Sequence, residues 1–121
     1  MIGALLALAL AGQPAAPPVS GVPPVRPRTY LAGYFHDSDY PPEALRNREQ
    51  GSVGVRMTVG PDGRVRACTV VASSRSPSLD SATCRIILER ALFRPARDAD
   101  GRPVADDVVS RVHWILPRRG R

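Results

Sequence analysis

The sequence predicts a small α+β domain in which helices cover one face of a three-stranded sheet. Three observations favour this class. Apolar and polar residues alternate over 51–59, a turn motif at 60–63 reverses the chain, and a second β-rich run follows at 64–71. A helical segment then separates this hairpin from a last alternating strand, which ends at Trp114.

The first helix is expected at 42–49, ahead of the hairpin. Pro42 suits the first turn of a helix, Glu43, Ala44 and Leu45 are good helix formers, and Gly51 follows as a stop. This helix brings the chain to the first strand.

The hairpin comes next. In its first strand Val53, Val55, Met57 and Val59 should face the core, because side chains of a strand alternate between the two faces of a sheet. The motif Gly-Pro-Asp-Gly at 60–63 sets a tight turn, since proline pre-sets φ and glycine accepts a positive φ.

The second helix is predicted at 79–93. Ser76 or Ser78 can cap its N-terminus, Pro77 fits its first turn, and Asp80 suits the positive end of the helix dipole. Phe93 should be a late-helix apolar residue, and Pro95 forces the chain out of the helix.

The topology follows from these connections. The hairpin makes strands one and two antiparallel neighbours, and the helix returns the chain so that strand three runs parallel to strand two. If strand three pairs with strand one, it is antiparallel to it, and the strand order is two-one-three. In strand three Val108, Ser110, Val112 and Trp114 then face the helix layer.

The two ends of the 121-residue chain differ from this domain. Residues 1–12 form an uncharged apolar run, shorter than the roughly 20 residues that span a bilayer. Small residues at Ala9 and Ala11 suit signal-peptide cleavage, although no positive charge precedes the run. We expect a signal peptide and no stable membrane span; the alternative is a start further upstream and a longer membrane segment.

The region 13–39 is expected to be a tether and leading loop. Its first part, 13–28, is rich in proline, which supplies no backbone donor and favours an extended chain. A ligand for a proline-reading groove is the alternative. The folded domain is placed at 40–116, followed by a basic tail at 117–121.

The chain is strongly basic, with a formal net charge of +6, and all 17 of its basic residues are arginine. Such a balance fits nucleic acid, an acidic protein surface or anionic lipid head groups. The aromatic residues do not interleave with arginines as a stacking platform for bases requires, and an exported protein rarely meets nucleic acid. Nucleic acid is therefore not an expected partner.

Several motifs together resemble the TonB C-terminal domain family, in its order and near its spacing, over about 40–116. They are YPPEAL at 40–45, GSVGVRMTV at 51–59, PDGRV at 61–65, SS at 73–74, LD at 79–80, FRPA at 93–96 and GRPV at 101–104. The resemblance implies a periplasmic domain that binds the TonB box of a TonB-dependent outer-membrane receptor and passes on energy from the inner membrane.

The resemblance also bears on the two cysteines. Cys68 and Cys84 stand where the family usually has apolar residues that face the layer between sheet and helix. Both thiols should then meet in that layer, and in an oxidising compartment such a pair forms a disulfide. Two buried free cysteines are the alternative.

Catalytic and metal sites are not expected, and no cofactor is implied. The cluster at 36–39 (HDSD) has no metal-ligand spacing, Ser73 and Ser74 lack a glycine elbow and a base partner, and His113 should be solvated beside Arg111. The chain is predicted to be a binding module and not an enzyme.

The binding element is predicted at the edge of the last strand. There Val109, Arg111, His113 and Ile115 face away from the helix, and an edge strand offers unpaired backbone groups to an extended peptide. TonB-like domains capture the TonB box at this strand, and Arg111 and Arg56 are the expected specificity contacts.

An alternative function uses the same edge. In it the chain is a structural or regulatory envelope module that forms a homodimer or docks on another protein. The anchor that a full energy transducer needs is not evident in 1–12.

Overall fold

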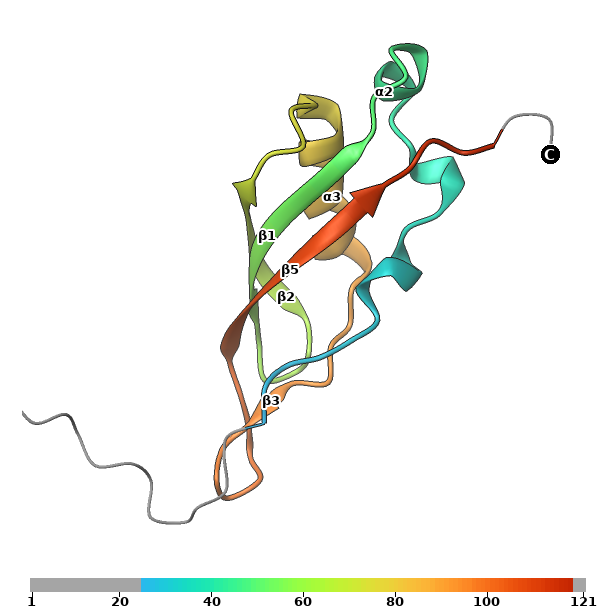
Figure 1. The fold of residues 1–121 in the computed structure, drawn as a ribbon. Coiled ribbons are helices and arrows are strands. Elements are labelled where there is room, and N and C mark those ends of the chain that lie inside the picture. The colour runs from blue at the N-terminus through green and yellow to red at the C-terminus, as the bar shows by residue number, and fades with distance from the viewer. Residues whose placement is uncertain (1–24, 119–121) are drawn as a thin grey trace, which may run out of the picture.

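The computed structural model describes residues 25–118 (Figure 1). The predicted signal peptide at 1–12, the first part of the tether and the end of the basic tail lie outside the described residues. Within them, no helix has the length and apolar character needed to cross a membrane. The elements in chain order are the 3-10 helices η1 (Leu31–Tyr34) and η2 (Asp37–Asp39), then α2 (Pro42–Arg46), β1 (Gly51–Val59), β2 (Val65–Ala72), α3 (Pro77–Arg90), β3 (Ala96–Arg97), β4 (Pro103–Val104) and β5 (Asp106–Trp114).

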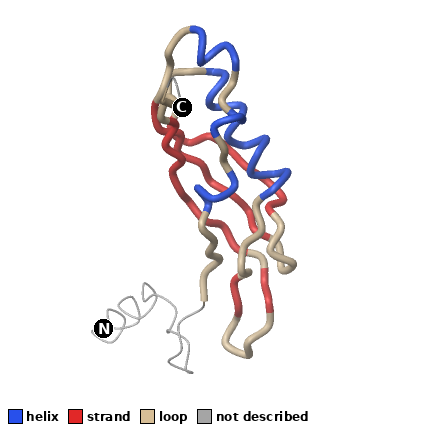
Figure 2. Tube along the Cα trace, turned by 90° about the vertical axis from the view of Figure 1, so that its right-hand side faces the viewer, coloured by secondary structure: helices blue, strands red, loops and turns tan. Residues whose placement is uncertain are grey.

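The main sheet has three strands in the order β2-β1-β5, and both pairs are antiparallel. This confirms the predicted order two-one-three and the α+β class. The β1–β5 register runs from Gly51 opposite Trp114 to Val59 opposite Asp106. The helix α3 lies across one face of the sheet and leaves the other face uncovered (Figures 1 and 2).

The core lies between the sheet and α3, as the alternation of β1 predicts. Val53, Val55, Met57 and Val59 are fully buried, and the helix contributes fully buried side chains of its own. Those are Leu79, Thr83, Ile86 and Ile87. The alternation predicted for the last strand also holds, because Val112 and Trp114 are buried and their neighbours are exposed.

The helices have other bounds than predicted. The helix α2 ends at Arg46 and not at residue 49, since Arg48 adopts a left-handed φ of 53° that ends the helix. The helix α3 starts at Pro77, where Ser76 caps it by accepting a hydrogen bond from the Leu79 N–H (3.3 Å).

The C-terminal end of α3 corrects a further prediction. The helix ends at Arg90, so Phe93 is not a helical residue. Phe93 is nevertheless buried, and its N–H donates to the carbonyl of Gly63 (2.8 Å) in the hairpin turn. Gly63 has a φ of 86°, as the turn motif requires.

The predicted disulfide is confirmed. Cys68 on β2 and Cys84 on α3 are bonded, with their Cα atoms 5.6 Å apart and a sequence separation of 16. The bond ties the outer strand β2 to the helix that covers the sheet.

The segment before Tyr40 packs against the domain. Val25 and Arg28 form backbone bridges with Arg97 and Arg94, and the short β3–β4 hairpin, which the sequence did not predict, continues that pairing. The placement of the domain boundary at Tyr40 stays a prediction, to which the structure adds these contacts of residues 25–39.

Candidate functional site

The strand β5 lies at an edge of the sheet. It pairs with β1 on one side and, within residues 25–118, with no strand on the other. The Asp107 N–H donates to the carboxylate of the preceding aspartate (2.8 Å), whereas the Leu116 N–H donates to Gln50 Oε1 (3.1 Å) on the β1 side. Backbone direction alternates along a strand, so odd-numbered residues direct their N–H and C=O groups to the open side. Such residues are Val109, Arg111 and His113.

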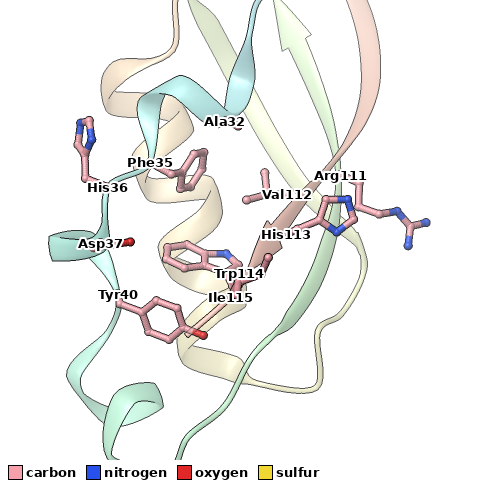
Figure 3. Close-up of a pocket in the computed structure, with 10 residues that line it drawn as sticks. All are labelled: Ala32, Phe35, His36, Asp37, Tyr40, Arg111, Val112, His113, Trp114 and Ile115. Atoms are coloured by element: carbon pink, nitrogen blue, oxygen red, sulfur yellow. The ribbon is translucent and has the colours of Figure 1, made fainter. Parts of the chain in front are cut away.

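A groove runs along the C-terminal half of this edge. Its cavity has a volume of about 280 Å³, and its walls are β5 and the segment that contains η1 and η2 (Figure 3). The lining residues are Ala32, Phe35, His36, Asp37, Tyr40, Arg111, Val112, His113, Trp114 and Ile115. Aromatic side chains form the inner part of the groove, and charged or polar side chains lie at its rim.

Trp114 is the fixed centre of the groove. It is only 5% exposed, and its indole N–H donates to Thr83 Oγ1 (2.8 Å) on α3. Phe35 and Tyr40 both meet the indole edge-to-face, with ring centroids 5.4 and 5.3 Å away. Because Trp114 and Tyr40 are each also held by a hydrogen bond, the groove is pre-organised for an apolar side chain.

The wall opposite β5 is held by an ion pair. Both terminal nitrogens of Arg90 donate to the carboxylate of Asp39 (2.7 and 2.9 Å), and one also donates to the Tyr34 carbonyl (3.1 Å). These hydrogen bonds from Arg90 lower the pKa of Asp39 to about 2, against the raising effect of burial. Arg90 thereby fixes η1 and η2 to the end of α3.

The remaining wall residues are held locally. The His36 N–H donates to Asp39 Oδ2 (2.8 Å), which closes the first turn of η2. The Tyr40 hydroxyl donates to the Glu49 carbonyl (2.5 Å), and burial raises the pKa of Tyr40. The cluster at 36–39, which the sequence places in the leading loop, therefore forms part of the groove wall.

The structure brings some predicted binding residues together and separates others. Arg111, His113 and Ile115 line the groove, and the side chain of Ile115 is 72% exposed. Val109 is 62% exposed and lies further along the same edge, outside the groove. Arg56 lies on the central strand β1, opposite Val109 on the uncovered face, and does not line the groove.

His113 has a partner that the sequence did not suggest. Its Nδ1 lies 2.6 Å from the Ser52 hydroxyl on β1, across the uncovered face. Thr58 and Asp107 form a similar cross-strand hydrogen bond (2.8 Å) near the other end of β5. These side-chain pairs hold β5 to β1 and leave its outer backbone groups free.

Sequence reasoning missed the aromatic wall, above all Phe35 and Tyr40. A signal was present, because Tyr30, Tyr34, Phe35 and Tyr40 are four of the six aromatic residues of the chain. Aromatic side chains gain stability by burial, so this concentration indicates a segment that packs and not a free loop.

The residues 37–116 match the family described as Gram-negative bacterial TonB protein C-terminal. A comparison of the sequence with curated proteins found no match. The chain belongs to the TonB C-terminal domain family, whose members are not enzymes and act in the periplasm. A disulfide is consistent with that compartment.

Proposed function

We propose that this chain binds an extended, TonB-box-like peptide of a TonB-dependent outer-membrane receptor by strand addition at β5. The observation that carries the proposal is the open edge of β5 beside a groove with a fixed aromatic centre. In strand addition the backbone of the edge supplies affinity, and pockets for alternate side chains supply specificity. Both parts are present on this edge.

The added strand takes its hydrogen bonds from the outward backbone groups of Val109, Arg111 and His113. Alternate side chains of the peptide then point to opposite faces of the extended sheet. Those on the helix side enter the groove beside Trp114 and Phe35. An apolar side chain is the best match there, because the rings offer few free polar atoms.

The peptide side chains that point to the uncovered face of the sheet lie near arginine. Arg111 is exposed on that face and forms no ion pair among the residues the structure describes. An acidic or polar residue in the peptide would pair with it, and Arg56 lies on the same face one strand further in. Arg111 is thus a direct contact of the peptide and Arg56 a longer-range one.

The rest of the chain fits an envelope protein. In this proposal residues 1–12 direct export and 13–39 include the tether, while 40–116 form the receptor-binding domain and 117–121 a basic tail. The mature protein is then periplasmic. If residues 1–12 belong to a membrane anchor, this chain itself passes on energy from the inner membrane. If they are cleaved, a partner protein supplies that coupling.

The test is a titration of the full chain with synthetic peptides that copy the TonB boxes of the host's receptors. Val109→Pro removes an outward N–H and should abolish binding, whereas Val109→Ala keeps that N–H and should bind as the native chain does. Arg111→Glu should weaken binding less, and more at low salt than at high salt, because an exposed charge pair is screened.

The alternative function gives a different result. A structural or regulatory module that uses this edge for a homodimer would bind none of the peptides and would form a tight dimer. In that case Val109→Pro would produce monomers, which sedimentation analysis would detect.

A further inference from the structure

Two arginines face each other on a second surface, away from the groove. The Arg28 N–H donates to the Arg94 carbonyl (3.1 Å), and the Arg94 N–H donates to the Arg28 carbonyl (2.9 Å). Residues in such a doubly bonded antiparallel pair project their side chains to the same side, with Cα atoms about 5.5 Å apart. Like charges placed directly opposite each other destabilise a strand pair.

Nothing in the described part of the chain neutralises this pair. The ion pairs among residues 25–118 are Arg26 with Asp106 and Arg90 with Asp39. The backbone of Arg64 is bridged to Leu92, so a third arginine lies near the same surface. Proteins tolerate such a local cost at functional sites, so the pair marks this surface as a candidate site.

Apolar side chains accompany the arginines. Tyr30 is 79% exposed and Leu92 is 53% exposed. Both line a shallow hollow of about 580 Å³ together with Arg28 and Arg94. An exposed tyrosine and leucine beside cationic groups have the composition of a surface that sits at a membrane–water boundary.

We propose that the surface formed by Arg28, Tyr30, Arg64, Leu92 and Arg94 docks on the anionic phospholipid head groups of a bilayer. The guanidinium groups meet lipid phosphates, to which they bind in a fork geometry. Tyr30 and Leu92 enter the boundary between head groups and acyl chains. An acidic peptide matches the charges equally well, but it gives these two exposed apolar side chains no counterpart.

The surface is separate from the groove. It is formed where residues 28–30 meet the segment that leaves α3, whereas the groove lies at the C-terminal end of β5 (Figures 1 and 3). The two sets of lining residues have no member in common. Lipid binding at this surface therefore uses none of the residues that line the groove.

The test measures binding of the full chain to vesicles by flotation. One set contains phosphatidylglycerol in phosphatidylcholine, and the other contains phosphatidylcholine alone. Any partition of the apolar run 1–12 is common to both sets, so the readout is the ratio of the two affinities. The double variant Arg28→Gln, Arg94→Gln is compared with Arg46→Gln, Arg118→Gln, which removes the same charge elsewhere.

We expect the native chain to prefer the anionic vesicles, and this preference should fall about 30-fold in the first double variant, since each surface arginine contributes about 1 kcal/mol. The control pair should change it by less than about threefold. Tyr30→Ser with Leu92→Ser keeps the charge and should also weaken binding to anionic vesicles. Circular dichroism verifies that each variant is folded.

Three results would overturn the proposal. One is equal loss in both arginine pairs, which would mean unspecific attraction by net charge. Another is no preference for anionic vesicles in the native chain. The third is binding of a glutamate-rich peptide that depends on Arg28 and Arg94 while vesicles are ignored, which would assign the surface to an acidic protein.

Discussion

The disulfide between Cys68 and Cys84 gives a quantitative prediction about stability. The bond closes a loop of 16 residues in sequence between β2 and α3. In the chain-entropy treatment, closing a loop of that size destabilises the unfolded state by about 3 kcal/mol. For a domain of this size, 1 kcal/mol shifts the melting temperature by about 4–8 °C, so the shift should be about 12–24 °C.

The assay is thermal and urea unfolding of three samples: the oxidised chain, the same chain under reductant, and the variant Cys68→Ser, Cys84→Ser. The reduced chain keeps both sulfur atoms, and the variant removes them. Agreement between the reduced chain and the variant therefore assigns the loss to the covalent link. The measured mass of the reduced chain should also exceed that of the oxidised chain by two hydrogen atoms.

A difference of less than about 1 kcal/mol between the unfolding free energies of the oxidised and reduced chains would refute the predicted stabilisation. Such a result would mean that the unfolded chain already keeps β2 close to α3, so that the link removes little entropy. Two thiols that react freely with an alkylating agent in the folded, exported protein would contradict the bond itself.

Two further predictions concern the turn of the hairpin and the wall of the groove. Gly63→Ala places a Cβ against the Phe93 carbonyl oxygen at a φ of 86°, while Gly101→Ala has a similar φ of 80° but open space. Urea unfolding should show a loss of about 1 kcal/mol for Gly101→Ala and at least about 1 kcal/mol more for Gly63→Ala; equal losses would contradict the close approach. The Arg90–Asp39 pair stabilises the fold above the ordinary pKa of the Asp39 carboxyl, 3.8, and loses this effect as the pH falls through about 2. The melting temperatures of the native chain and of Arg90→Gln should therefore differ more at pH 6 than at pH 2, where the Asp39 carboxyl is about half protonated, and an equal difference at the two pH values would refute the role of the charge.

Much of the sheet was predictable because its signals are local. The alternation of Val53, Val55 and Met57 and the turn motif at 60–63 define a hairpin without reference to the rest of the chain. The strand order follows once the helix is long enough to return the chain across the sheet. Prediction of the disulfide required the family resemblance, because that resemblance places both cysteines in the layer between sheet and helix.

The groove was predictable only on one side. The alternation along the last strand assigns Arg111, His113 and Ile115 to the sheet face away from the helix. In the structure these three residues line the groove. The other wall depends on contacts between distant parts of the sequence, such as the ion pair between Asp39 and Arg90, 51 residues apart. No local pattern in 30–40 encodes those partners, and only the concentration of aromatic residues there indicates that the segment packs.

The most direct test of strand addition at β5 is amide hydrogen exchange of the full chain, read residue by residue by NMR with and without a bound receptor peptide. The N–H groups of Val109, Arg111 and His113 face the open edge and should exchange more slowly when the peptide is bound. Those of Val108, Ser110 and Val112 already bond to β1 and serve as internal controls with little change. Protection of the odd-numbered residues alone is the result that strand addition predicts. Equal protection along the whole strand, or protection only at a distant surface, would contradict it.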